Sequence, residues 1–548
     1  MSNALLERST PELQLVVSNP KHKNHLGRWI VIALGILLAC AAIAVKLLVD
    51  RAEPIMRARV IDTLSTRFHS RVELDGFHVS VRDGVQVSGE GLRIYRRTDL
   101  GVERQSQAFP PVIAVKAFQF RTSVESLLKS TIHVQTVKVD GLVIDVPPRE
   151  ERHEMPTLQG QPGGKPGTIR IVVDRIECDR TKLLIHSSKP GKLPLDFEIR
   201  SLVLRRVGAD LPMKFDAVLV NPKPVGDIQS SGDFGPWQPD SPRDTPVDGS
   251  YTFTHADLGT IKGIGGILSS TGGYSGKLGK IVVDGETDTP DFRLNISGRP
   301  LPLHTQFHAI VDGTSGDTYL EPVNARLAHT QIIAKGFVVR VPDRGHEIKL
   351  EATVSEGRID DLLKLAVRTD PPVISGRVSL KAQIDLPPGD PDVARRLNLD
   401  GSFQITGVHF SNENIQQKVD SISLRTQGQP QLLGQAHYDD VPSDATGTFT
   451  LRQAMLSFSQ LQFGFPGTQV NLTGVYGLDG NTFDFHGKVR LEAKLSQMVT
   501  GKKRFLLKAI DPFFSKNGAG TEVPIKITGT KSEPQFGLDY GRNDEKKY

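Results

Sequence analysis

The strongest constraint on the fold is an alternation of apolar and polar residues that recurs along most of the chain. In the segment 377–385, Val378, Leu380 and Ile384 alternate with charged and polar neighbours. Successive side chains of a β-strand point to opposite faces, so this spacing places the apolar residues on one face. Strands buried on both faces, as in parallel sheets, would be apolar throughout. The pattern therefore predicts an antiparallel sheet with one apolar face and one wet face.

Short runs of this kind follow one another from residue 72 almost to the C-terminus, with Gly, Pro, Asn and Asp between them roughly every 10 to 14 residues. The 52 glycines and 35 prolines agree with many turns. We predict a mainly β fold, in which a long antiparallel sheet curls into a taco-like groove with a few short helices. The residues expected to line the groove are Ile348, Leu350, Val354, Val378, Leu380, Ile384, Leu399, Phe403, Ile405, Phe483 and Phe485.

Alternation alone fits a second architecture equally well. A set of β-sandwich domains would cover each apolar face with another sheet. Helical lids are scarce, because the helical patterns at 123–130, 358–367, 391–397 and 502–514 are all short. The sequence therefore leaves both the open groove and the tandem sandwich as interpretations.

Residues 29–49, WIVIALGILLACAAIAVKLLV, form an apolar run with a single charge, Lys46. About 20 helical residues span the hydrocarbon core of a bilayer. The run is longer than the apolar part of a signal peptide, and it continues past Cys40, where a lipoprotein would turn polar. We predict one transmembrane helix with Trp29 as its interfacial anchor.

Flanking charges do not orient this helix, because basic residues lie on both sides of it. The polar body of about 500 residues that follows has no second apolar span. This asymmetry favours a short internal tail and an exported body.

Changes of pattern divide the chain into segments. Residues 51–68 have an apolar stripe at helical spacing and predict a neck helix that packs on the first strands. Residues 150–168 have no periodicity and several Gly and Pro, which is typical of a linker. The predicted segments are a tail at 1–28, the membrane helix at 29–49, a β module with its neck helix at 50–149, the linker at 150–168, the extended β-groove at 169–500, and a C-terminal helix with closing strands and a polar tail at 501–548.

Composition argues against two classes of function. Lys and Arg total 67 against 62 Asp and Glu, and no basic block is present, so we expect no nucleic-acid partner. The two cysteines, Cys40 and Cys178, cannot build a disulfide framework or a zinc cluster.

Motifs of catalysis and cofactor binding are not found in the sequence. There is no P-loop, HExxH, CxxC, GxSxG or EF-hand loop. His304 and His308 lie in a strand-like segment about 13 Å apart, too far to share a metal. The Gly-rich stretch 259–276 is interpreted as turns between strands, and Asp360 and Asp361 as acids at a helix start. We expect no catalytic residues, no metal and no cofactor.

Three segments have a recognisable pattern of apolar residues and glycines. They are the strand pair at 72–94, VELDGFHVSVRDGVQVSGEGLRI, the helix and two strands at 123–146, and the closing segment at 520–539. Together they resemble the AsmA-like family of bacterial envelope proteins. The resemblance covers both ends of the chain and the middle loosely, through structural patterns of apolar residues and glycines. It implies a periplasmic β-groove anchored in the inner membrane, whose apolar interior carries the acyl chains of phospholipid or another lipid toward the outer membrane.

Residues 502–514, KKRFLLKAIDPFF, combine basic and apolar side chains. Such composition permits contact with an anionic membrane surface, through Phe505, Leu506, Phe513 and Phe514. The alternative is a helix that caps the end of the sheet. Two arrangements for transfer stay open, an envelope protein partner at the C-terminal end or a membrane-tethered shuttle.

The leading hypothesis is a non-enzymatic, single-pass protein of the bacterial inner membrane with its bulk in the periplasm. It would hold or conduct acyl chains and support outer-membrane assembly and lipid homeostasis. The runner-up is a structural scaffold of tandem β-sandwich modules that binds envelope partners through loops. An enzyme acting on an envelope polymer is a third class, for which the sequence offers no constellation of residues.

Overall fold

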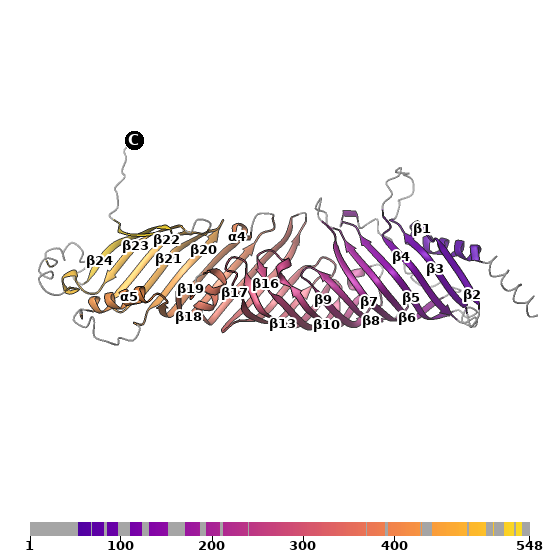
Figure 1. The fold of residues 1–548 in the computed structure, drawn as a ribbon, viewed down its shortest axis with the longest axis horizontal. Coiled ribbons are helices and arrows are strands. Elements are labelled where there is room, and N and C mark those ends of the chain that lie inside the picture. Colours follow the sequence, from indigo (N-terminus) through magenta and orange to yellow (C-terminus); the bar gives the residue numbers. More distant parts are fainter. Residues whose placement is uncertain are drawn as a thin grey trace, which may run out of the picture.

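A single long β-sheet with few helices makes up the described part of the chain (Figure 1). Twenty-five strands belong to it. The mainly β, antiparallel fold class predicted from alternation is thereby confirmed. The computed structural model describes residues 53–66, 68–81, 85–96, 110–122, 131–148, 150–151, 170–186, 193–208, 212–238, 241–342, 344–368, 370–389, 393–427, 429, 441–478, 482–499, 508, 520–530 and 533–539.

The strands follow one another along the sheet almost in chain order, each hydrogen-bonded to its predecessor and its successor. Strands β1 and β2 both pair with β3, and β10 pairs directly with β12, while the short β11 pairs with β13. The first strands are β1 (Val72–Glu73), β2 (Gly76–Val81), β3 (Val85–Ile94), β4 (Ile113–Thr122), β5 (Thr131–Val146), β6 (Arg170–Ile185), β7 (Leu195–Val207), β8 (Met213–Pro222), β9 (Val225–Phe234), β10 (Pro246–Asp257), β11 (Ile264–Gly265), β12 (Ile267–Lys277) and β13 (Lys280–Leu294). The others are β14 (Leu301–Val311), β15 (Thr318–Leu327), β16 (Thr330–Val341), β17 (Gly345–Arg358), β18 (Ile374–Leu386), β19 (Asn398–Phe410), β20 (Asp444–Arg452), β21 (Met455–Phe465), β22 (Thr468–Gly477), β23 (Thr482–Leu491), β24 (Thr521–Thr530) and β25 (Pro534–Leu538).

The sheet is open. Among the described strands, β2 pairs only with β3 and β25 only with β24, so each end has a free edge. The tandem sandwich is not observed in the described ranges, because every strand there belongs to this one sheet.

One pair of strands breaks the antiparallel order. β5 and β6 run parallel and are in register over their whole length. β5 has 16 residues, which is about 50 Å at about 3.3 Å per residue, so the chain must return over that distance before β6 begins. Parallel neighbours need such a long crossover, and the segment 150–168, predicted as a linker, belongs to this connection.

A helix over residues 53–66 lies within the predicted neck-helix span of 51–68. Its Val60 and Ile61 pack against a cluster formed by Leu74, Phe77 and Val87. The helix therefore covers the apolar side of the first strands, at the N-terminal end of the sheet (Figure 1).

Helix α3 (Ile359–Ala366) and the short α4 (Val393–Arg396) lie within the helical spans predicted at 358–367 and 391–397. Asp360 and Asp361 occupy the first turn of α3, as expected of helix-start acids. Asp361 is fully buried and accepts hydrogen bonds from the backbone N–H of His329 at 3.0 Å and the hydroxyl of Thr330 at 3.1 Å. It fastens α3 to the β15–β16 hairpin.

Helix α5 (Glu413–Thr426) was missed in the sequence analysis. Its start is capped by Asn412, whose side chain accepts a hydrogen bond from the N–H of Ile415. Val419 and Leu424 are buried, and the hydroxyl of Ser423 donates to the carbonyl of Pro466 at 2.9 Å. The cap and the helical spacing of Ile415, Val419 and Ile422 are the signals that predict this helix.

The interpretation of the stretch 259–276 as turns was wrong for most of its length. The 3-10 helix η3 (Leu258–Thr260) and β11 lie at its start, but β12 runs through its last ten residues. Gly272, Gly273 and Gly276 of β12 pair with both β10 and β13, and the ring of Tyr251 lies against Gly272. The remaining short helices are η2 (Pro242–Asp244) and η5 (Leu495–Gln497). The helices predicted at 123–130 and 502–514 lie outside the described residues, apart from Lys508.

Replacing Asp361 by Ala should destabilise the protein by about 3 kcal/mol, because two buried donors lose a charged acceptor. Equilibrium urea unfolding followed by circular dichroism measures this loss. Asp361→Asn is the matched control: it keeps one acceptor oxygen and should lose less. Equal stability of Asp361→Ala and the wild type would contradict the role of Asp361 as the clamp of α3.

Candidate functional site

One face of the sheet carries mostly apolar side chains and is called the apolar face. Residues paired across neighbouring strands share a face, so a row of side chains can be followed from strand to strand. The first row, row 1, takes one residue from every strand except β1 and β11, and none of its members is charged. Row 1 consists of Phe77, Gly89, Phe118, Val139, Cys178, Leu202, Ala217, Ser230, Tyr251, Gly272, Gly285, Phe307, Val323, Ala334, Ala352, Ala382, Gly401, Phe449, Phe458, Gly474, Phe485, Ile527 and Phe536.

A second row lies beside the first on the same face. Row 2 runs from β2 to β24 and is likewise free of charged residues. It consists of Val79, Val87, Phe120, Val137, Ile176, Leu204, Phe215, Gly232, Gly249, Tyr274, Val283, Ala309, Leu320, Gly336, Leu350, Ile384, Leu399, Leu451, Leu456, Tyr476, Phe483 and Gly529.

The opposite face is polar. Ion pairs join neighbouring strands on it, such as Lys335 with Glu351 at 3.0 Å and His308 with Asp284 at 2.7 Å. A row on this face from β2 to β14 consists of His78, Ser88, Gln119, Lys138, Glu177, Val203, Asp216, Ser231, Ser250, Gly273, Asp284 and His308.

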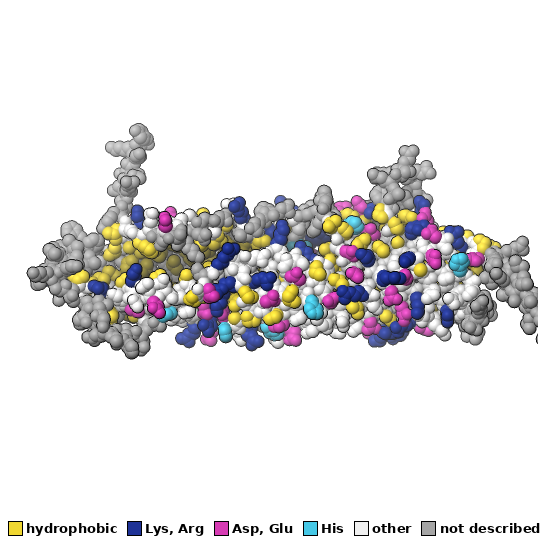
Figure 2. Space-filling model, in the orientation of Figure 1, with side chains coloured by type: hydrophobic (Ala, Val, Ile, Leu, Met, Phe, Trp, Pro, Cys, Tyr) yellow, Lys and Arg dark blue, Asp and Glu magenta, His cyan; other side chains and the backbone are white. Residues whose placement is uncertain are grey.

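Most apolar side chains of rows 1 and 2 are half-buried, whereas Cys178, Ala309 and Leu451 are buried. In β23, Phe483 and Phe485 are half-buried, while Asp484 and His486 between and beyond them are exposed. Figure 2 shows a hollow near the C-terminal end that is lined by hydrophobic side chains, and charged side chains over the face turned to the viewer. A contiguous apolar surface of this length marks a site of interaction.

The lining of this face is thin, because aromatic rings lie down over glycines of the neighbouring strand. A β-carbon at Gly401 would come within 2.5 Å of the Phe449 ring, and one at Gly447 within 2.8 Å of the Phe403 ring. Only glycine permits such close approach. The rings therefore lie close to the backbone of the neighbouring strand and do not project far from the sheet.

Aromatic side chains gather toward the C-terminal end of the apolar face. Ring centroids are 6.3 Å apart for Phe403 and Phe449 and 5.7 Å apart for Tyr476 and Phe483. Aromatic pairs at such distances add to the stability of the strands that carry them. The apolar face continues to the last strand, where Phe536 is 75% exposed.

All residues predicted to line a groove lie on described strands and on the apolar face. The predicted residues that belong to rows 1 and 2 are partly exposed to solvent. Leu380 and Phe403 pair with each other beside row 1, and Ile348 pairs with Val338 and Leu386. The row members among them are Leu350, Ile384, Leu399, Phe483 and Phe485.

Three of the predicted groove residues are already covered by the protein itself. Val354, Val378 and Ile405 are 2%, 2% and 4% exposed. Ile359 and Leu362 of α3 pack on the cluster they form. These three residues stabilise the sheet and its helix rather than presenting an open surface.

Sequence reasoning missed the N-terminal half of the apolar face. Phe118 and Phe120 of β4, Ile176 of β6 and Leu204 of β7 belong to it. The alternation in residues 113–120, IAVKAFQF, is a signal that could have found the first of them.

The residues predicted to contact membranes lie outside the described residues. These are Trp29, Phe505, Leu506, Phe513 and Phe514, together with the whole segment 29–49. Within the ranges that the structure covers, no helix is both long enough and apolar enough to cross a bilayer. The membrane contacts stay predictions.

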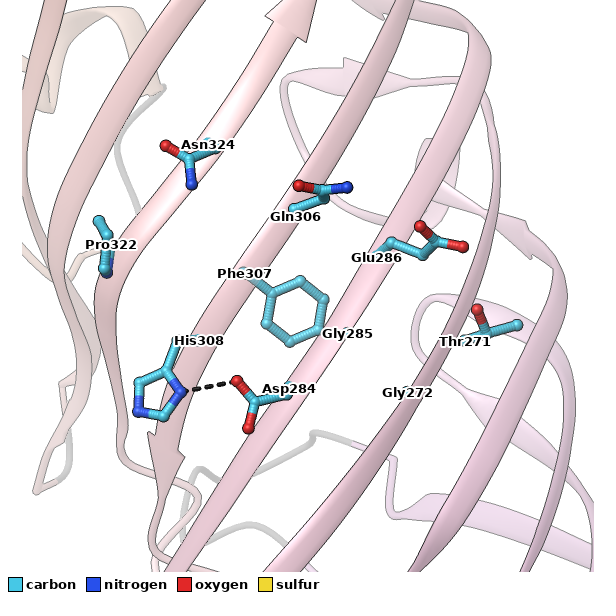
Figure 3. A pocket seen from close by; sticks show the side chains of 10 residues that line it. All are labelled: Thr271, Gly272, Asp284, Gly285, Glu286, Gln306, Phe307, His308, Pro322 and Asn324. Carbon is cyan, nitrogen blue, oxygen red and sulfur yellow. Dashed lines mark hydrogen bonds and ion pairs between the residues drawn. The ribbon is translucent and has the colours of Figure 1, made fainter.

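A shallow depression of about 540 Å³ lies on the polar face near the middle of the sheet (Figure 3). The dashed contact in Figure 3 is the bond between His308 and Asp284. Gly272, Gly285 and Phe307 of row 1 form its floor as seen from the polar side. Among the described residues, no group of three His, Cys, Asp or Glu side chains could hold a metal ion. Its other lining residues are Thr271, Glu286, Gln306, Pro322 and Asn324.

Comparison of the chain with protein-family models, with curated proteins and with solved structures finds no match. The features that bear on function are therefore the sheet and its two faces.

The pKa of His486 should be raised above 6.5, because its ring bonds the carboxylate of Asp539 at 2.8 Å and that of Asp484 at 3.0 Å. His486 is in β23 and Asp539 follows β25, so the charged ring helps to hold the last strand. A raised folded pKa means that this stabilisation is present below pH 6.5 and is lost as the pH rises through the folded pKa.

An NMR titration of the His486 ring measures this shift. Asp539→Asn should lower the pKa of His486, whereas Asp284→Asn on a distant strand should leave it unchanged. A His486 pKa at or below 6.5 in the wild type would contradict the pairing.

Proposed function

We propose that the protein holds and conducts lipid acyl chains on the apolar face of its sheet, as a groove between membranes. The observation that carries the proposal is the continuity of rows 1 and 2, which cross the sheet without a charged side chain on a face that is only half-buried. Such a face loses its unfavourable contact with water when acyl chains cover it.

The energetics favour a path over a single pocket. Burial contributes about 0.8 kcal/mol per methylene group wherever the chain lies, since apolar contacts are not directional. At about 4.8 Å per strand, row 1 is on the order of 100 Å long. An acyl chain spans half of a bilayer core, about 15 Å, so it can occupy many positions of similar energy along the face.

The polar parts of the lipid would stay at the rim in water. Rows 1 and 2 contain no charge that could pair with a phosphate, and the opposite face carries the ion pairs. The segment 29–49 would anchor the chain in the inner membrane, with the sheet in the periplasm and an envelope protein or the outer membrane at the far end. The cargo would be phospholipid or a lipid with similar chains, in agreement with the resemblance to AsmA-like proteins.

Photo-crosslinking on a single strand tests the proposal. A photoreactive amino acid at Ile384, on the apolar face, should form adducts with lipid in living bacteria grown on radioactive phosphate. The same residue at the adjacent Gln383, exposed on the polar face, should form few. Equal adducts at both positions would argue that contact with lipid is not confined to the apolar face.

Charges placed in the path should block passage. In the double variant Leu350→Asp and Ile384→Asp, whose side chains are cross-strand partners, adducts at Phe485 should fall on the order of tenfold or more, since a buried charge is costly. Adducts at Val137, toward the proposed membrane anchor, should persist.

The matched control reverses the charge of Glu351 and adds one at Gln383, its cross-strand partner on the polar face of the same two strands. Glu351→Lys with Gln383→Lys should leave adducts at Phe485 unchanged. Undiminished adducts at Phe485 in a folded Leu350→Asp and Ile384→Asp variant would refute conduction along the rows.

A further inference from the structure

The apolar face changes character half-way along the sheet. Between β9 and β14 hydroxyl-bearing residues and glycines take many of the positions on this face, beside Val283, Phe307 and Ala309. We call these hydroxyl residues the belt. The belt consists of Ser230, Tyr251, Ser270, Tyr274, Thr287 and Thr305.

Strand pairing places the whole belt on the apolar face. Ser230 and Tyr251 are cross-strand partners in row 1, and Tyr274 belongs to row 2. Ser270 and Thr305 both pair with Thr287, in the row on the other side of row 1. The belt therefore crosses the path from side to side rather than lining one rim.

The two tyrosine rings are held flat by glycines. A β-carbon at Gly249 would lie 2.7 Å from the hydroxyl oxygen of Tyr274, and one at Gly272 would lie 2.8 Å from the ring of Tyr251. Each phenol oxygen is thereby fixed near the floor of the path. An acyl chain lying on the sheet must pass over both oxygens.

The direction of each hydrogen bond follows from the serines. The hydroxyl of Ser230 donates its one proton to the carbonyl of Ser250 at 2.9 Å, so in its 2.8 Å contact with Tyr274 the tyrosine is the donor. The hydroxyl of Ser270 likewise donates to the carbonyl of Glu286 at 2.9 Å, so Tyr251 donates in its 3.0 Å contact with Ser270.

Both phenol protons are therefore used, while both phenol oxygens keep their acceptor capacity. Burial raises the pKa of Tyr274, which keeps its proton in place at neutral pH. Among the described residues, no other donor reaches either phenol oxygen. Thr287 and Thr305 bond each other at 2.6 Å.

We propose that the belt is a selectivity subsite for lipid chains that carry a hydroxyl group part-way along the chain. A plain alkyl chain over the belt displaces the water bound to two acceptor oxygens and offers no hydrogen bond in its place. A hydroxyl on the chain donates to one of them and restores the lost bond. This inference rests on the proposed function, because it assumes that acyl chains occupy the apolar face.

Paired crosslinking probes test the belt in the purified full chain. A photoreactive amino acid at Val283, the row 2 partner of Tyr274, is exposed to equal amounts of octadecanoic acid and 12-hydroxyoctadecanoic acid. Mass spectrometry of the adducts should give a preference for the hydroxylated chain of roughly fivefold to tenfold, the effect of about one hydrogen bond. The same photoreactive group at Phe485, far from the belt, should give no preference.

The double variant Tyr251→Phe and Tyr274→Phe removes both acceptors and keeps both rings. It should abolish the preference while octadecanoic acid binds as before or better. Tyr319→Phe is the matched control, since Tyr319 is on the polar face and is 43% exposed. It should change neither adduct.

The other outcomes separate the belt from the groove. Equal adducts of both acids in the wild type would overturn the belt and leave the groove standing. A preference that survives in Tyr251→Phe and Tyr274→Phe would also overturn it, because the selectivity would then lie elsewhere. No adduct at Val283 or Phe485 with either acid would refute the groove itself, and the belt with it.

Discussion

Backbone pairing that keeps its register from strand to strand underlies every property of this structure. A slip of one residue would exchange the apolar and polar faces of a strand. Bulges preserve the faces where spacing changes: Leu320 and Val323 are three residues apart, yet both face the apolar side, because their partners Ala309 and Phe307 are two apart. Pro322 lies in this bulge, one of the few places in a sheet where a proline is tolerated. The apolar face is therefore continuous because the backbone hydrogen bonds keep the strands in register. Hydrophobic residues alone would not align from strand to strand.

The second determinant is the way in which small and large residues are matched across strands. Gly401 is the cross-strand partner of Phe449, and Gly474 is that of Phe485. Each ring therefore packs over a residue that has no side chain. In an ordinary core, side chains from two layers interdigitate and fill the space between them. Here the N-terminal helix and α3 supply a second layer over parts of the sheet. Elsewhere on the described strands, most side chains of rows 1 and 2 are only half-buried.

The sequence predicted the fold where alternation is unbroken, and the structure explains where it did not. β18 and β23 follow strict period two, and their apolar residues were identified individually. Strand β12 in the middle of the sheet was not predicted, because Gly272 and Tyr274 resemble a turn when read alone. Only their pairing with the strands on either side shows that they belong to the sheet. Helix α5 was not predicted from the sequence, because its polar composition resembles that of the loops around it. The covering of Val354 and Val378 by α3 depends on tertiary packing, which no local pattern contains.

The direction of the hydrogen bonds has a mechanical consequence. Bonds between strands are perpendicular to the strands, and in this molecule the strands cross the long axis (Figure 1). Because the strands run obliquely to this axis (Figure 1), tension between the two ends would pull neighbouring strands apart as well as slide them past each other. The short pairing of β24 with β25, five residue pairs long, would open before the ten-pair contact of β23 with β24. Each strand added to such a body makes it longer without raising the force that separates its weakest pair of strands.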